Sequence, residues 1–336
     1  MENGAGSRRR PERSARCLFF SLAVFLAAGV FWSKSASAER VRIATPAKSL
    51  TYLNFFAGEK FGAYKSEGLA VSLEQITAKI SVAGGLSGDV DYTLAIGTIM
   101  RAAATGMPVK ALMFTMDRVL FFMLAKPEFK RIEDLKGRKK IVAVNDIGAT
   151  PAFAAIAMAR AHGVDPEKEL TFVSMGNPQN ALAALQSGSA DVAMLSLPFN
   201  FKAEALGFRN LGSAVDYMRT PLAGVGATVA KIKSNPDQVK RMLRGTLKSL
   251  EFTLNPVNRE KVVGLIMDEF KLGREDASRS LTESVKAFSR DGIVPDDALR
   301  AEIEDLRKRL KIMVDVSVSQ LVDYALLKEV LAEMKR

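Results

Sequence analysis

Small and polar residues follow four of the apolar, strand-like runs in this sequence. The four segments are residues 46–52, 97–98, 146–150 and 197–200. Each leads toward a predicted helix, whose first backbone N–H groups and positive dipole end favour a polar or anionic ligand. Because parallel strands place their carboxyl ends at one edge of a sheet, we expect these segments to meet there. The candidate ligand-binding residues in them are Lys48, Ser49, Tyr52, Thr98, Gly148, Thr150, Phe199 and Asn200.

Asp117 and Arg118 complete the candidate set. They precede a predicted strand close to the point where the chain is expected to cross between two lobes. An arginine there could bind a carboxylate or a sulfonate through two parallel hydrogen bonds. Other interpretations stay open: Arg118 in a structural ion pair, Lys48 as a solvated lysine, and Tyr52 and Phe199 as core residues. The four segments could likewise be caps and turns only.

Histidine and cysteine, which carry much nucleophilic and metal chemistry, each occur once. His162 ends a predicted helix just before Gly163, where an imidazole is favoured by the helix dipole. With one histidine and with Cys17 near the N-terminus, neither a Ser-His-Asp triad nor a Cys- or His-rich metal site is expected. Gly224 and Gly226 lack the third glycine of a dinucleotide-binding motif. We therefore predict no catalytic residue, no metal and no cofactor.

The sequence resembles itself at a fixed offset. Residues 86–91 (LSGDVD) are answered by residues 186–191 (QSGSAD), and an apolar run follows both. Asp91 and Asp191 hold matching places before these runs, so we interpret them as structural. A duplicated unit of this size predicts two similar lobes, and a cleft between lobes is a common place for a small ligand.

Strands alternate with helices along most of the chain, which predicts an α/β fold with mostly parallel sheets flanked by helices. The last expected strand, over residues 225–232, is followed by helices only. The chain must therefore leave the first lobe and return to it. We expect the first lobe to comprise residues 39–129 plus 223–336 and the second residues 130–222, with the two crossings as a hinge.

Residues 1–38 have the pattern of a secretory signal peptide. A basic stretch containing five arginines precedes the apolar run Cys17–Trp32, and Ala36-Ser37-Ala38 supplies small residues for cleavage. Cys17 lies ahead of the apolar run rather than after it, so lipid attachment is not expected. The sequence thus predicts an exported protein; a retained N-terminal anchor is the alternative.

Composition is typical of a soluble globular protein with a large core: 336 residues, 48% hydrophobic, with a formal net charge of +11. The positive charge is spread along the chain and gives mild support for an anionic ligand. The one compact basic cluster, residues 136–140, has no interleaved aromatic residues for stacking on bases. Binding to nucleic acid is therefore not expected.

Several motifs, in this order and spacing, resemble periplasmic solute-binding proteins of the nitrate, sulfonate and taurine type and the related binders of thiamine-pyrimidine precursors. The motifs are residues 61–71, Ser87–Asp91, Asp134–Lys139, Ala184–Asp191 and the C-terminal segment 321–327. The resemblance implies a bilobal periplasmic-binding-protein fold of type II, closing on a small solute such as a sulfonate or a carboxylate. It also implies delivery to the permease subunits of an ABC importer; we expect a monomer.

The chain departs from the pattern at one position. Leu197-Pro198 stands where many relatives have Glu-Pro, so the resemblance does not fix the ligand. Some eukaryotic relatives are pyrimidine-precursor synthases that depend on a cysteine-rich motif and histidine, and the mature chain would contain no cysteine. Such an enzyme using the same cleft remains the alternative function, and a sensory ligand-binding module is a further one.

Overall fold

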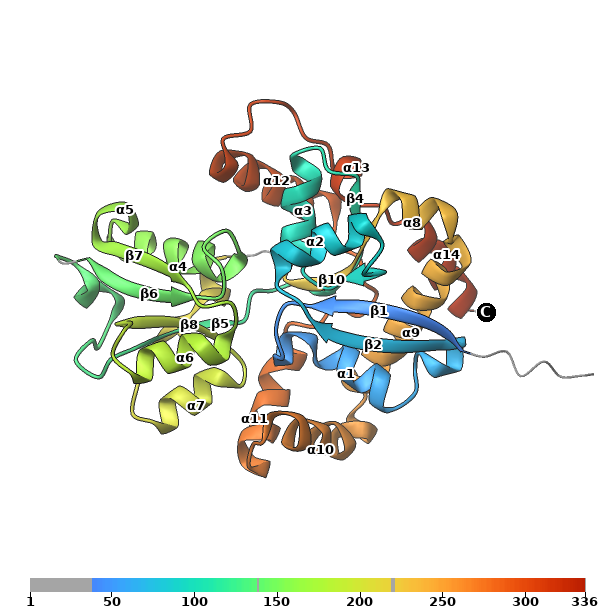
Figure 1. Cartoon of the computed structure of the whole chain (residues 1–336). Helices are drawn as coiled ribbons and strands as arrows, with labels where there is room; N and C mark the ends of the chain where they lie inside the picture. Colours follow the sequence, from blue (N-terminus) through green and yellow to red (C-terminus); the bar gives the residue numbers. More distant parts are fainter. Residues whose placement is uncertain (1–37, 138, 219–220, 336) are drawn as a thin grey trace, which may run out of the picture. The chain divides into compact units, whose positions relative to one another are not determined.

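Two five-stranded sheets with the same internal arrangement organise the chain (Figure 1). The computed structural model describes residues 38–137, 139–218 and 221–335, so the predicted signal peptide lies outside the described residues except for Ala38. The first sheet has the order β2-β1-β3-β10-β4, formed by Leu69–Gln75, Glu39–Thr45, Tyr92–Thr93, Ala223–Thr228 and Val109–Met116. The second has the order β7-β6-β8-β5-β9, formed by Leu170–Ser174, Lys140–Val144, Val192–Ser196, Phe121–Ala125 and Arg209–Ser213.

Each sheet has a parallel half and an antiparallel half. β1 is parallel to β2 and β3, and β6 is parallel to β7 and β8. β10 runs antiparallel to β3 and β4, and β5 runs antiparallel to β8 and β9. The sheets are therefore mixed, although mostly parallel sheets were expected. The parallel strands belong to the duplicated units. The antiparallel pairing arises because β5 and β10 each enter their sheet after the chain has passed over from the other sheet.

The crossings can be located from the strand pairing. The first lies between Met116, the end of β4, and Phe121, the start of β5 in the second sheet. It comes earlier than the boundary at residue 129 that the sequence suggested, because an apolar run such as β5 does not reveal which sheet it joins. The chain returns between β9 and β10, and β10 starts at residue 223.

The repeated aspartates have the same structural role in both sheets. Asp91 accepts a hydrogen bond from the backbone N–H of Arg42 at 2.8 Å and pairs with Lys231 at 2.7 Å. Asp191 accepts one from the backbone N–H of Ile141 in β6 at 3.0 Å and pairs with Lys126 at 2.7 Å. Each carboxylate thus ties the central parallel strand to a lysine that follows the antiparallel strand.

Helices connect and cover the strands (Figure 1). Those of the first half and the second sheet are α1 Leu53–Lys60, α2 Ala78–Ser87, α3 Ile96–Ala104, α4 Thr150–Ala161, α5 Pro166–Glu169, α6 Pro178–Gln186 and α7 Phe199–Ala205. After β10 come α8 Val229–Ser234, α9 Pro236–Leu254, α10 Arg259–Phe270, α11 Arg274–Val285, α12 Asp296–Leu310, α13 Val318–Leu321 and α14 Ala325–Met334. The strand expected over residues 225–232 ends early, because the Thr228 hydroxyl accepts from the N–H of Lys231 at 3.1 Å and caps α8.

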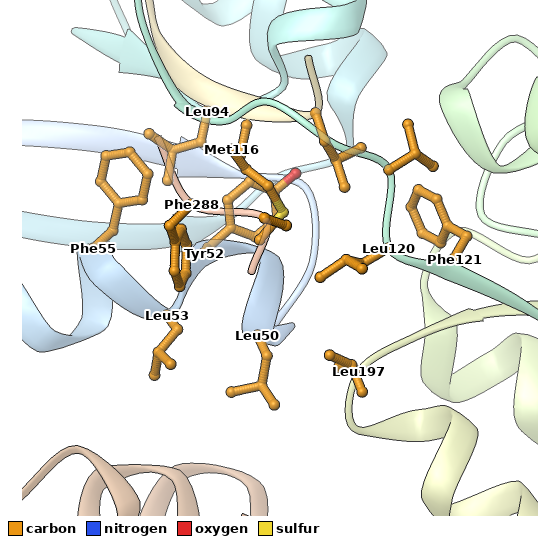
Figure 2. Packing of buried hydrophobic residues seen from close by; sticks show 14 of the residues in the cluster. Leu50, Tyr52, Leu53, Phe55, Leu94, Met116, Leu120, Phe121, Leu197 and Phe288 are labelled. Carbon is orange, nitrogen blue, oxygen red and sulfur yellow. The ribbon is translucent and has the colours of Figure 1, made fainter. Parts of the chain in front are cut away.

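The largest buried apolar cluster contains residues of both sheets. Val41 and Val142, from β1 and β6, both belong to it. Figure 2 shows Leu50, Leu120 and Leu197 among its members. Leu120 lies in the first crossing between the sheets, whereas Leu50 follows β1 and Leu197 follows β8. A smaller cluster that includes Leu185 is confined to the second sheet and its helices.

Candidate ligand-binding site

Three helices begin at the wall of one cavity of about 300 Å³. Its lining includes Ala78 at the start of α2, Gly97 and Thr98 in the first turn of α3, and Thr150 and Pro151 at the start of α4. α2 and α3 follow strands of the first sheet, whereas α4 follows β6 of the second. The free N–H groups and positive dipole ends of three helices therefore point to a ligand with negative charge.

Two basic side chains line the same cavity, and both come from the first half of the chain. Lys79 lies in the first turn of α2. Arg101 lies one helical turn after Thr98, and its Nη2 donates to the Thr98 hydroxyl at 2.8 Å. The Arg101 guanidinium also lies 5.5 Å from the centre of the Phe153 ring on α4. These contacts hold a permanent positive charge at the cavity wall.

The start of α3 approaches the start of α4 closely because residue 97 is glycine. A Cβ atom on Gly97 would lie 2.9 Å from the Thr150 hydroxyl oxygen and 3.3 Å from Arg101 Nη1. Thr150 is buried and is the first residue of α4, after the N-cap Ala149. The close approach leaves no room for a side chain between the two helices.

Apolar side chains form another part of the wall. Tyr52, Phe121 and Leu222 are each buried, and they come from the loop after β1 and from the two crossings. Burial raises the pKa of the Tyr52 phenol above its usual value, so Tyr52 is neutral and can donate a hydrogen bond. Ile80, at the start of α2, is instead 62% exposed at the cavity. A ligand with an organic part would find apolar contacts here.

The second sheet contributes polar groups opposite the basic ones. Asn145 and Asp146 follow β6 and line the cavity, as does Ser174 at the end of β7. Asp146 Oδ1 accepts a hydrogen bond from the backbone N–H of Gly148 at 2.8 Å. This bond fixes the loop that leads into α4 and places an acceptor beside the cavity.

The structure divides the sequence candidates between several places. Tyr52, Thr98 and Thr150 line the cavity, and Gly148 supports its wall through Asp146. Lys48 lies elsewhere, because its amine pairs with Glu269 at 2.6 Å.

Asp117 and Arg118 line a separate cavity of about 590 Å³ beside the first crossing. Burial raises the pKa of the Asp117 carboxyl, and the Arg118 charge opposes that shift. The two residues therefore lie outside the lining of the cavity at the helix starts, and their role in ligand binding stays a prediction.

Ser49, Phe199 and Asn200 are buried, and each lies outside the cavity at the helix starts. Ser49 Oγ donates to Ser196 Oγ at 2.9 Å. Phe199 belongs to the apolar cluster of the second sheet, and the Lys202 amine lies 5.4 Å from the centre of its ring. Asn200, in the first turn of α7, is 1% exposed.

Sequence reasoning missed both basic residues of the site. Arg101 is three residues after Thr98, so it shares a helix face with a residue that was chosen. Lys79 was missed because it lies in none of the four candidate segments, although α2 begins at Ala78 beside the cavity. Extending each candidate loop by one turn into the next helix would have found Arg101.

His162 lies apart from the cavity. It is the C-cap of α4, as its place before Gly163 predicted. Its ring nitrogens contact Glu133 Oε1 at 2.7 Å and the Tyr217 hydroxyl at 2.9 Å. Within the described residues, no group of three or more histidine, cysteine, aspartate or glutamate side chains could hold a metal ion. No helix in that part of the chain has the length and apolar character needed to cross a membrane.

Two sheets of this topology, with a cavity at the helix starts that follow them, define the periplasmic-binding-protein fold, and solved structures share it. A protein from Bordetella bronchiseptica RB50 matches with a TM-score of 0.75 and 18% identity, over 90% of this chain and 99% of that one. The periplasmic nitrate-binding protein NrtA from Synechocystis PCC 6803 matches with a TM-score of 0.73 and 12% identity, over 89% of each chain. The periplasmic aliphatic sulphonate binding protein SsuA from Escherichia coli matches with a TM-score of 0.66 and 16% identity, over 86% of this chain and 99% of that one.

Residues 51–258 match the family described as NMT1/THI5 like, and the chain belongs to this family. Family and fold confirm the resemblance inferred from the sequence motifs. Among curated protein sequences, none matches the chain.

Proposed function

We propose that this protein binds a small organic anion in the cavity between its two sheets and delivers it to an ABC importer. One observation carries the proposal: the N-termini of α2, α3 and α4 meet at one cavity together with Lys79 and Arg101. Asp146 is the acidic side chain in that lining. The sum of two side-chain cations and three helix dipoles favours an anion over a cation or a neutral solute.

Volume and lining favour an organic anion over a bare oxyanion. A cavity of about 300 Å³ is at the lower end of the roughly 300–1,000 Å³ that is typical of sites for small organic ligands. A bare oxyanion would fill a small part of this space and leave Tyr52, Phe121 and Ile80 facing water. A sulfonate or carboxylate with an organic body would bury these side chains and place its charge near Arg101.

Hinge closure is the mechanism we infer. The first lobe brings the basic side chains and two helix starts, and the second brings α4 and its polar loop. A ligand that contacts both lobes stabilises the closed state relative to the open one. The structural neighbours named as nitrate- and sulphonate-binding periplasmic proteins support this role, as does the export signal expected at residues 1–38. The protein would act in the periplasm as a monomer and meet the importer's permease subunits in its closed form.

A binding role is favoured over catalysis. A pyrimidine-precursor synthase of the kind that the sequence resemblance suggests depends on a cysteine-rich motif and histidine at the ligand. His162 is held by Glu133 and Tyr217 at the far end of α4, and Cys17 lies in the expected signal peptide. Turnover of a bound compound by the purified protein would instead favour the enzyme.

A thermal-shift screen with sulfonates, carboxylates and aromatic acids, followed by calorimetric titration of each hit, tests the proposal. We expect Arg101→Gln to weaken binding of a hit by about 1.5–3 kcal/mol, since a hydrogen bond to a charged group is lost. Lys48→Gln is the matched control, because Lys48 pairs with Glu269 outside the cavity. The proposal fails if no compound in the screen shifts the melting temperature, or if both variants bind the hit as the parent does.

A further inference from the structure

The two lobes touch directly along one flank of the cavity, where the loop before α7 meets the loop after β1. Ser49 Oγ lies 2.9 Å from Ser196 Oγ, and the backbone N–H of Leu50 donates to the carbonyl of Leu197 at 3.1 Å. Ser49 and Ser196 are each 2% exposed. We call this side of the cavity the α7 flank. It comprises these two loops, α7, and the parts of α10 and α11 that α7 contacts.

Two longer side chains extend the contact along α7. The Lys202 amine donates to the carbonyl of Phe270, the last residue of α10, at 2.9 Å. Burial lowers the pKa of the Lys202 amine, which fits its place between the lobes. Further along, the Arg279 guanidinium of α11 lies 4.6 Å from the centre of the Phe201 ring. Each contact joins a helix of the second lobe to a helix of the first.

Apolar side chains fill the space behind these polar contacts. Leu50, Leu120 and Leu197 are at most 7% exposed and belong to the cluster that both sheets share (Figure 2). Separating the lobes on this flank would bring these leucines into contact with water. It would also leave the Leu50 N–H and the Leu197 carbonyl to find new partners, so opening here is disfavoured.

The opposite side of the cavity is held differently. Ile80, at the start of α2, is 62% exposed, and Gly176 of the second lobe is an exposed part of the lining. Within the described residues, no hydrogen bond or ion pair joins α2 to the second sheet or its helices. The α2 helix itself therefore makes no contact with the second lobe comparable to that of Ser49 and Ser196, and the nearest inter-lobe contact on this side is that of Arg101 on α3 with the Phe153 ring on α4.

We propose that the α7 flank is a latch that keeps the lobes joined when no ligand is bound, so that the cavity opens and closes on the α2 side alone. Ser49, Leu50, Ser196, Leu197 and Lys202 form the latch. The ligand then enters between the start of α2 and the loops of the second lobe. The inference depends on the hinge closure proposed above, but it concerns the ligand-free protein.

Distances between pairs of spin labels test the latch. The sequence has one cysteine, so Cys17→Ser gives a full chain without others. Ala205→Cys with Glu275→Cys places labels on exposed positions of α7 and α11, across the latch. Ala83→Cys with Gln179→Cys places them on exposed positions of α2 and α6, across the proposed opening. In the ligand-free protein, we expect a narrow distance distribution for the first pair and a broad one for the second.

A second arm breaks the latch. Ser49→Ala, alone and with Leu197→Ala, should broaden the first pair's distribution toward that of the second pair. Ser317→Ala is the control, because Ser317 caps α13 by accepting from the Gln320 N–H at 3.2 Å within the first lobe. The latch is refuted if the first pair is already as broad as the second, or if the folded Ser49→Ala variant leaves its width unchanged. None of these measurements needs a ligand, so failure to find a binding anion and failure of the latch are separate results.

Discussion

Asp191 shows how one carboxylate stabilises this fold at the scale of a residue. Burial opposes its ionisation, but hydrogen bonds from the Lys126 amine and a β6 backbone N–H outweigh burial and hold its pKa below the usual value. We expect Asp191→Asn to lower the free energy of unfolding by about 1.5 kcal/mol at pH 7, because the amide keeps an acceptor but loses the charge. Urea unfolding of parent and variant gives the difference.

The same residue predicts a dependence on pH. A carboxyl whose pKa is lowered by folding contributes stability above its unfolded pKa, and that contribution disappears as pH falls through the folded value. The difference between parent and Asp191→Asn should therefore be constant near neutral pH and shrink below pH of about 4. Asp268→Asn, at an exposed position of α10, should show no comparable change. A difference that stays the same down to pH of about 3 would contradict this account.

At the scale of an element, β10 depends on glycine where it passes between a strand and a helix. A Cβ atom on Gly224 would lie 1.9 Å from the carbonyl oxygen of Met113 on β4, and one on Gly226 would lie 2.8 Å from Ile99 of α3. We expect Gly224→Ala to destabilise the protein by about 3 kcal/mol or more, since a backbone carbonyl cannot move aside. The free energy of unfolding in urea measures the loss.

Gly264 in α10 is the matched control for that substitution. A Cβ atom there would meet nothing within 4 Å, so alanine fits without strain. Gly264→Ala should stabilise the protein by about 0.5–1 kcal/mol, because alanine favours a helix over the unfolded chain. If both variants were destabilised alike, close packing of β10 would not be the cause.

The sequence predicted the elements better than the side chains of the site. Repeated motifs and apolar runs revealed the duplicated strand and helix units, and several of the loops after the strands line the cavity at the helix starts. Whether a loop residue faces the cavity depends on tertiary contacts. Lys48 turns to Glu269, and Ser49 turns to Ser196, 147 residues away. Arg101 was missed because helix periodicity shows which residues share a face, but not that this face borders a cavity.

The antiparallel strands set another limit on prediction. In the sequence, β5 and β10 look like any other apolar run. The strands that they pair with depend on whether the chain has passed to the other sheet before them. An assignment from sequence therefore placed β5 in the first lobe. In the sequence, Gly224 and Gly226 of β10 were considered only as part of a dinucleotide-binding motif, which they do not complete. Their packing role could not be predicted, because it depends on where Met113 and Ile99 lie in space.

For the whole molecule, the apolar cluster that both sheets share predicts that the lobes unfold together. Leu197 lies in this shared cluster, whereas Leu185 lies in the cluster confined to the second sheet, and both are 1% exposed. Either leucine changed to alanine should cost about 2–5 kcal/mol. If the lobes are coupled, each variant moves one calorimetric peak whose van't Hoff and calorimetric enthalpies agree. If they are not, the parent shows two peaks, and Leu185→Ala moves only one of them. Coupling of this kind gives the latch its physical basis, because a core that both lobes share resists opening on the side where it lies.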